Sequence, residues 1–305
     1  MQIVKTTDPQ SKPSIIAMIY GSGGVGKTTF AATAPKPLLV DCENGSKYFG
    51  LRGIAVDIAK VNQWSDMEGL FDIAKSGQYE TIIIDPIGEL MEKLKRYMIL
   101  KGDKKLVQSD GSPSMAGWGW LKDTMRSTVK ILRDSGCNLL LIAHVDEKGD
   151  EEKLVKRPAI MTKLSDELVN MVDIVGYMTV LQIDGEEKRV IIVDPASDKY
   201  IAKDRTGQLG KYIPPDFGQI VNACQGTEVY AWSSDTAKDV KMAEIAKATE
   251  EKQVVANGVT TESVQDKLNV ANGKEAPVVQ APVEEVAEEI EVVPVAKVAK
   301  KKVTE

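Results

Sequence analysis

The sequence has few of the residues that stabilise small secreted or metal-rich proteins. Its 305 residues contain three cysteines, Cys42, Cys137 and Cys224, whose wide spacing fits neither a CxxC motif nor a zinc site. It contains a single histidine, which excludes a histidine-based metal cluster. The cysteine pattern is typical of reduced thiols in a cytosolic protein.

Long hydrophobic segments are also missing. The apolar runs at 15–20 and 139–143 have the length of β-strands and are far too short to cross a membrane. The N-terminus lacks a basic start followed by an apolar stretch, so no signal peptide is predicted. We therefore expect a cytoplasmic protein that makes no membrane contact.

A strong excess of positive charge is absent as well. The net charge is −6, and half of it lies in residues 236–305, which hold ten lysines and thirteen acidic residues. The remainder is nearly neutral for its size. This balance argues against a protein-wide electrostatic attraction to DNA but allows a local basic groove.

Hydrophobic patterning predicts one α/β domain followed by a tail. Residues 1–13 form a polar lead-in, and residues 14–232 form the domain. Residues 233–305 are predicted to begin with a helix and to continue as a charged, disordered tail, because they contain almost no aromatic residues to bury.

Within the domain, short apolar runs alternate with helical segments, which predicts a mostly parallel sheet with helices on both faces. The expected strands are 14–20, 38–41, 54–58, 81–85 and 138–144, and the expected helices are 27–34, 66–75, 89–100 and 120–133. Strands at 174–183 and 188–193 flank Asp184-Gly185 and predict an antiparallel hairpin at one edge, followed by a short strand at 200–202. The glycine- and charge-rich segment 101–119 is predicted to be a loop, and the charged segment 145–160 to be mobile.

A glycine-rich loop follows the first predicted strand. Residues 21–28 (GSGGVGKT) match the phosphate-binding motif G-x-x-x-x-G-K-[ST] at every fixed position. Backbone amides in such a loop converge on phosphates, while its lysine contacts the β- and γ-phosphates and its threonine binds Mg²⁺. The predicted nucleotide-binding residues are Gly21, Ser22, Gly23, Gly24, Val25, Gly26, Lys27, Thr28 and Thr29. Lys27 is also predicted to act in catalysis.

A carboxylate is expected at the end of a downstream strand to organise the magnesium. Asp85 ends the apolar run 81–85 and fits this role. The predicted metal ligands are therefore Thr28 and Asp85, with ATP and Mg²⁺ as the cofactors.

The order of these elements resembles the RecA-like P-loop ATPases. The segment 38–45 (LLVDCENG) is similar to the family's strand ending in Asp-x-Glu, which implies that Glu43 is the general base that activates water. A carboxylate near the γ-phosphate is chemically suited to that task. The alternative is an exposed capping or loop acid. The loop also resembles that of the ParA-type ATPases, but their extra lysine is replaced here by Ser22.

Two further segments carry the resemblance. The segment 139–144 (LLLIAH) is similar to the strand whose last polar residue senses the γ-phosphate, usually a Gln, so His144 is either this sensor or a structural histidine. The segment 203–207 (KDRTG) resembles the K-[N/D]-R-x-G and K-x-R elements of RadA- and DnaB-type proteins. It implies that Lys203 and Arg205 reach a neighbouring subunit's nucleotide, with a surface basic pair as the alternative.

The resemblance covers residues 14–225 and is closest to compact bacteriophage RecA-like single-strand annealing proteins or recombinases of the Sak type. It implies an ATPase that binds single-stranded DNA and promotes annealing or strand pairing in the host bacterial cytoplasm. It also implies a homo-oligomer with ATP at subunit interfaces. Segments 101–119 and 146–163 are the expected DNA contacts, and the tail is a candidate contact for a single-strand-binding or other replication protein.

Two alternatives remain open. The first is an oligomeric motor of the DnaB or KaiC type, which directional unwinding of a forked duplex would favour. The second is a nucleotide-switched protein-interaction module that works through the tail, which DNA-independent turnover would favour.

Overall fold

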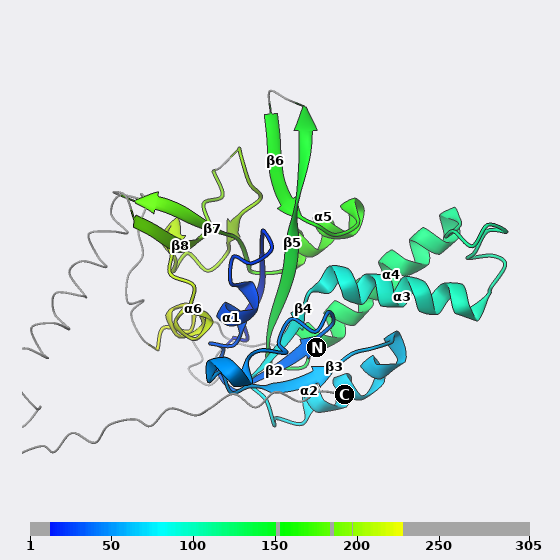
Figure 1. Ribbon diagram of the computed structural model, residues 1–305, viewed down its shortest axis with the longest axis horizontal. Helices are drawn as coiled ribbons and strands as arrows, with labels where there is room; N and C mark the ends of the chain where they lie inside the picture. The colour runs from blue at the N-terminus through cyan, green and yellow to red at the C-terminus, as the bar shows by residue number, and fades with distance from the viewer. Residues whose placement is uncertain (1–12, 151–152, 184–185, 197, 228–305) are drawn as a thin grey trace, which may run out of the picture. The chain divides into compact units, whose positions relative to one another are not determined.

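The computed structural model describes residues 13–150, 153–183, 186–196 and 198–227 (Figure 1). The predicted lead-in up to residue 12, the turn Asp184-Gly185 and everything from residue 228 onward, including the predicted helix and tail, lie outside the described residues.

One ten-stranded sheet organises the domain. Its strands are β1 (Ile16–Gly21), β2 (Pro37–Asp41), β3 (Asp57–Lys60), β4 (Thr81–Asp85), β5 (Asn138–Asp150), β6 (Lys153–Pro158), β7 (Ile174–Ile183), β8 (Glu186–Ile192), β9 (Lys203–Asp204) and β10 (Tyr212–Ile213). They lie in the order β10-β8-β7-β1-β5-β4-β2-β3, while β6 pairs with β5 and β9 pairs with β7. The six strands from β7 to β3 are parallel, and β8 runs antiparallel to both of its neighbours, β7 and β10. The predicted α/β fold, a mostly parallel sheet with an antiparallel edge hairpin, is confirmed.

Helices cover both faces of this sheet (Figure 1). They are α1 (Lys27–Ala31), α2 (Glu68–Lys75), α3 (Ile87–Lys101), α4 (Met115–Arg133), α5 (Thr162–Met171) and α6 (Phe217–Cys224), with short 3₁₀ turns η1 (Gly50–Arg52) and η2 (Trp64–Met67). Successive residues of a strand point to opposite faces. Met18 and Tyr20 therefore pack in the core under α2–α5, whereas Ala17 and Ile19 pack in the core under α1 and α6.

The charged segment 145–160 is not the mobile loop that the sequence predicted. β5 continues past His144 to Asp150, and β6 returns antiparallel to it, with Val145 opposite Pro158 and Asp150 opposite Lys153. This ribbon extends beyond the parallel part of the sheet (Figure 1). The backbone of the ribbon is paired between its two strands, and the ribbon does not cover the apolar core. It therefore needs no apolar pattern, and its charged sequence did not predict strands.

The segment 101–119 is likewise only partly a loop, because α4 begins at Met115. The Ser114 hydroxyl accepts a hydrogen bond from the Gly117 amide at 3.0 Å and caps the helix. A Cβ at Gly117 would collide with the Leu106 carbonyl, so this glycine is required by close packing and not by a turn. Two of the four glycines that predicted a loop, Gly117 and Gly119, therefore lie inside a helix.

Smaller corrections concern short elements. β3 lies at Asp57–Lys60 and not at 54–58, and the predicted strand at 200–202 is replaced by β9 at Lys203–Asp204. The sequence analysis did not predict α5, β10 or α6. Each is ten residues or fewer and depends on packing against the sheet, which local patterns do not encode.

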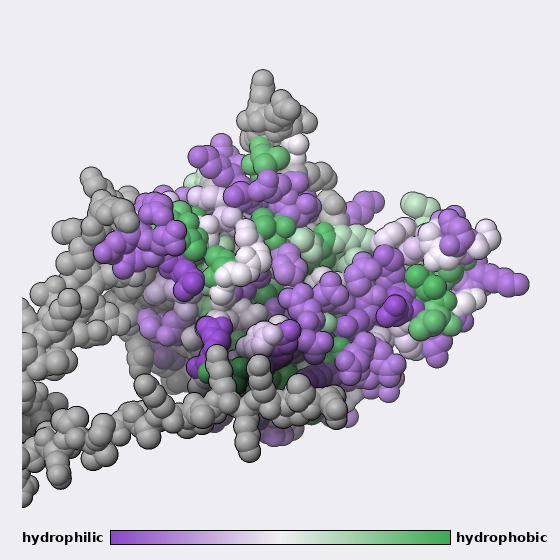
Figure 2. Space-filling model, viewed as in Figure 1, coloured by the Kyte–Doolittle hydropathy of each residue, from purple (hydrophilic) through white to green (hydrophobic). Residues whose placement is uncertain are grey.

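The outer ends of α3 and α4 carry an exposed hydrophobic patch, seen in green in Figure 2. Leu100 and Met115 are exposed to 80% and 89% there. No described helix is long and apolar enough to cross a bilayer.

Candidate functional site

The phosphate-binding loop connects the carboxyl end of β1 to α1. Gly24 and Gly26 have positive φ values of 76° and 102°, which glycine adopts without strain. The Lys27 ammonium donates to the carbonyls of Gly21 and Ser22 at 2.9 and 2.8 Å, so it lies folded against the loop. Burial lowers the pKa of Lys27, while the carboxylates of Asp85 and Glu43 act in the opposite direction.

The first glycine of the loop has a packing role. A Cβ at Gly21 would collide with the carbonyl oxygen of Met178 on β7, whereas a Cβ at Gly23 would meet no atom within 4 Å. Gly21 therefore allows β7 to approach the loop closely. Thr29, the last predicted loop residue, accepts a hydrogen bond from the Arg52 guanidinium at 3.2 Å.

The two predicted metal ligands lie side by side. The Thr28 hydroxyl hydrogen-bonds to the Asp85 carboxylate, and burial raises the pKa of Asp85 to about 6. Asp85 is 5% exposed, and its Oδ2 atom has no hydrogen-bond partner among the described residues. An orphaned carboxylate oxygen beside a threonine hydroxyl fits Mg²⁺, which takes few protein ligands and completes its shell with phosphate and water.

Glu43 is held at this end of the sheet by the segment after β2. The Asp41 carboxylate accepts hydrogen bonds from the amides of Glu43, Gly45 and Ser46, each at 3.2 Å, and from the Ser46 hydroxyl. A Cβ atom built on Gly45 would lie 3.8 Å from the Thr28 hydroxyl oxygen and 3.9 Å from a Glu43 carboxylate oxygen. Glu43 therefore lies close to the metal ligands, and Asp41 is a positioning residue that the sequence analysis did not single out.

His144 lies next to Glu43 in space. Its Nε2 atom is 3.4 Å from Glu43 Oε2, and the two side chains are 44% and 38% exposed. His144 pairs in register with Gly21, so the strand carries it to the level of the phosphate loop. It lies within β5 and not at the end of a strand, because β5 continues as the ribbon.

Arg189 is a basic residue beside the loop that the sequence analysis missed. Its Cδ and Nε atoms would lie 3.8 and 3.7 Å from a Cβ atom built on Gly26. It projects from β8, opposite Val180 of β7. No local motif marks Arg189, and only the pairing of the edge hairpin brings it to the loop.

Lys203 and Arg205 lie at the opposite end of the strands. Lys203 on β9 pairs with Val175, which pairs with Met18 of β1, three residues before Gly21. That offset corresponds to about 10 Å along a strand. The structure therefore brings Lys27, Thr28, Glu43, Asp85 and His144 together and leaves the basic pair outside this group within one subunit.

Both basic side chains make contacts within the subunit. The Lys203 ammonium donates to the carbonyls of Val169, Asn170 and Val172 at 2.8, 3.2 and 2.6 Å, at the end of α5. The Arg205 guanidinium donates to the Asn170 carbonyl at 2.9 Å and pairs with Asp173 at 3.2 Å. Cations are favourable at a helix C-terminus.

Two basic residues of the predicted DNA segment 146–163 also have partners within the subunit. Arg157 is 8% exposed and forms an ion pair with Asp166 at 3.1 Å. The Lys156 ammonium hydrogen-bonds to the Tyr177 hydroxyl at 3.2 Å. Charge reversal at these two positions would therefore perturb the fold and cannot by itself test DNA binding.

Residues 14–206, almost the whole described domain, match a known protein family, the AAA domain. The chain belongs to the AAA domain family. As a member of this family it has a P-loop nucleotide-binding domain, in agreement with the loop at 21–28 and the carboxylate at Asp85.

Proteins similar to this AAA domain chain include a prophage-derived protein and an archaeal protein of known structure. The SPbeta prophage-derived uncharacterized protein YorG of Bacillus subtilis (strain 168) is 26% identical over 216 residues, which cover 65% of this chain and 62% of the relative. The chain thus matches less than two thirds of that relative's length. The KaiC-like protein PH0186 of Pyrococcus horikoshii OT3 aligns with a TM-score of 0.36 and 14% identity, over 58% of this chain and 77% of that structure.

Proposed function

We propose that this protein is an oligomeric ATPase that binds single-stranded DNA and promotes annealing or strand pairing. The observation that carries the hydrolytic part is the grouping of Glu43, His144 and the Thr28–Asp85 pair beside the phosphate loop. The DNA part is supported by the resemblance to phage annealing ATPases and by the prophage origin of a relative. That relative is itself uncharacterised.

Each side chain has a distinct part in the proposed hydrolysis. Lys27 leaves the loop carbonyls and neutralises phosphate charge, and the loop amides orient the triphosphate. Glu43 orients the attacking water and accepts its proton. Thr28 and Asp85 would hold Mg²⁺, which when bound would supply electrostatic stabilisation of the charge that develops on the phosphates. His144 lies next to Glu43 and is suited to sensing the γ-phosphate.

Positive charge for the transition state has two proposed sources. Arg189 is close enough to Gly26 to contact a phosphate of its own subunit's nucleotide. Lys203 and Arg205 lie at the other end of the strands, so a role for them in hydrolysis requires the nucleotide of a second subunit.

Steady-state ATP hydrolysis, measured with and without single-stranded DNA, tests this proposal. We expect DNA to stimulate turnover, and Lys27→Ala to abolish it in both conditions. Annealing of complementary oligonucleotides should then require ATP and an intact Lys27. Turnover that ignores DNA would reject the recombination part and favour the protein-interaction alternative, whereas directional unwinding would favour the motor.

A further inference from the structure

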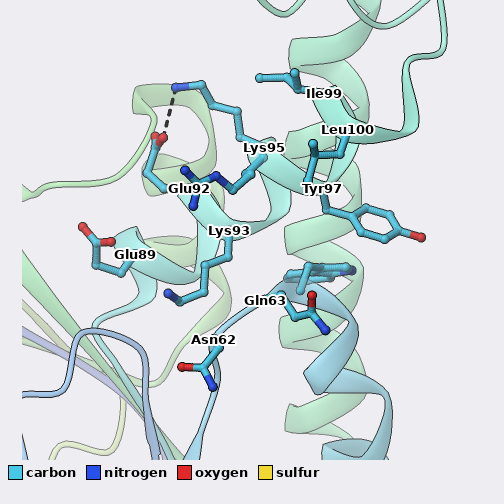
Figure 3. A pocket seen from close by; sticks show the side chains of 11 residues that line it. Asn62, Gln63, Glu89, Glu92, Lys93, Lys95, Tyr97, Ile99 and Leu100 are labelled. Atoms are coloured by element: carbon cyan, nitrogen blue, oxygen red, sulfur yellow. Dashed lines mark hydrogen bonds and ion pairs between the residues drawn. The ribbon is translucent and has the colours of Figure 1, made fainter.

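A groove between α3 and η2 is built differently from the nucleotide site. It encloses about 700 Å³, within the range of about 300–1,000 Å³ found for ligand sites. Figure 3 shows the Lys93 side chain on α3 extending towards the segment of Asn62, with Tyr97 and Leu100 further along the same helix. Glu89 also lines the groove, and its carboxylate points away from Asn62. Trp64 and Arg96 also line it.

The groove presents two cations with no hydrogen-bond or ion-pair partner among the described residues. Lys95 is engaged by Glu92 at 3.0 Å, which leaves Lys93 and Arg96. Across the described residues, neither of these two side chains makes a hydrogen bond or an ion pair. They are three residues apart on α3 and so lie on one side of the helix, where two phosphates of one strand could bind them.

Aromatic rings alternate with these cations. Trp64 lies across the groove from α3, and Tyr97 follows Arg96 directly. Towards the end of the helix, the Lys101 ammonium lies 5.1 Å from the centre of the Tyr97 ring, and the Lys95 ammonium lies 5.9 Å from the centre of the Trp118 ring. Exposed Lys104 and Lys105 continue the basic surface beyond the helix.

We propose that the α3–η2 groove binds single-stranded DNA, with phosphates on Lys93 and Arg96 and an unpaired base stacked on Trp64 or Tyr97. Basic side chains interleaved with aromatic rings are the chemistry by which proteins hold single strands without sequence preference. This inference rests on the proposed function and assigns its DNA to a surface. In the β5–β6 ribbon, Lys156 and Arg157 already have partners within the subunit.

The groove also adjoins the nucleotide site. Only Pro86 separates Asp85 from the first residue of α3. Burial raises the pKa of the Cys42 thiol to about 12, and the Lys93 ammonium acts in the opposite direction, so Lys93 lies within electrostatic reach of the segment that carries Glu43. DNA bound along α3 would thus act on the elements that hold both carboxylates, which gives DNA stimulation of hydrolysis a physical route.

The test is binding of labelled oligothymidine to the full-length protein, with and without ATP, over a range of salt concentrations. The double variant Lys93→Glu/Arg96→Glu should bind at least tenfold more weakly. Its slope of log affinity against log salt should be shallower by about 1.4, since each phosphate contact to a single strand contributes about 0.7. The matched variant Lys75→Glu/Lys130→Glu makes the same charge change on exposed residues of α2 and α4 and should keep the wild-type slope.

A second measurement does not depend on charge. Tyr97→Ala should weaken binding about tenfold while basal ATP hydrolysis persists, and oligonucleotides carrying photoreactive bromodeoxyuridine should cross-link to Trp64 or Tyr97. If the wild type binds DNA but the groove variants bind as their control does, or the cross-links map elsewhere, the inference fails and the proposed function stands. If the wild type binds no DNA, both fail. An acidic peptide that displaces oligothymidine equally well would mark a protein-docking groove and also overturn the inference.

Discussion

The two ends of the parallel strands carry similar polar side chains but use them in opposite ways. At the amino end, Lys203 and Arg205 make five contacts with the end of α5 and with Asp173. At the carboxyl end, Glu43 and Arg189 are exposed beside the phosphate loop. The amino end therefore stabilises the subunit, whereas the carboxyl end keeps charges available for a ligand.

Keeping a charge available for a ligand destabilises the ligand-free protein at Asp85. One of its oxygens is buried with no hydrogen-bond partner in the described part of the chain, which typically costs about 1–3 kcal/mol. Folded proteins keep few such groups, and those that persist call for an explanation. A metal-nucleotide ligand explains this one, and no comparable unsatisfied charge exists among the described residues of the amino end.

The largest expected effect of a substitution at the carboxyl end is on catalysis. Glu43→Gln keeps the shape of the side chain but removes its ability to accept a proton. Turnover should fall about 10²–10⁴-fold while ATP binding persists, because a positioned general base contributes about that much. Steady-state hydrolysis and nucleotide-binding titration measure the two effects.

Thermal unfolding provides the control for Glu43→Gln, and the midpoint should be unchanged because the side chain is exposed. A variant with wild-type turnover would show that Glu43 is only the loop acid that the sequence left open as the alternative. The two strand ends would then differ in the exposure of their charged side chains but not in catalysis.

Gly21 lies at the carboxyl end, but part of its role is in packing. Gly21→Ala should destabilise the domain by about 2–3 kcal/mol, because its Cβ would collide with the Met178 carbonyl. For a domain of this size, the unfolding midpoint should fall by about 5–10 °C. Gly23→Ala, whose Cβ meets nothing within 4 Å, is the matched control and should unfold as the wild type does.

Equal unfolding midpoints for the Gly21 and Gly23 variants would contradict that packing role. Gly21 would then be required only for phosphate binding, and the carboxyl end would be functional throughout.

At the amino end, Lys203→Met should lower the free energy of unfolding by about 1–2 kcal/mol. The substitution leaves three carbonyls at the end of α5 without the ammonium, although water reaches part of this surface. Denaturant titration of the variant and the wild type measures the change. Unchanged stability together with lost hydrolysis would instead assign Lys203 to a neighbouring subunit's nucleotide, as the family resemblance implies.

The sequence predicted the parts of this structure that are carried by local motifs. The phosphate loop, the strand ending at Asp85 and the proximity of Glu43 to the loop were all expected, because a buried parallel strand is a continuous apolar run and its polar last residue lies at the carboxyl edge. A glycine-rich loop between a strand and a helix is equally local.

The rest depends on contacts between distant segments. Arg189 reaches the loop only because β8 pairs with β7, and no residue near it marks that approach. The ribbon of β5 and β6 has no apolar period, so its charges were read as a mobile segment. Lys203 matches a family motif for contacts between subunits, yet its three hydrogen-bond partners lie more than thirty positions earlier in its own chain.

The smallest predicted effect concerns Arg189. Arg189→Ala should raise the KM for ATP about fivefold and leave the unfolding midpoint unchanged, because the exposed guanidinium lies beside Gly26 and stabilises no other described element. A fivefold change corresponds to about 1 kcal/mol, the upper end of what an exposed ion pair contributes. Arg189→Lys should recover part of the loss, since it keeps the charge but not the planar fork. If Arg189→Ala lowered stability by as much as Lys203→Met does, the two ends of the strands would not differ in the way proposed, because a basic side chain at the carboxyl end would also be structural.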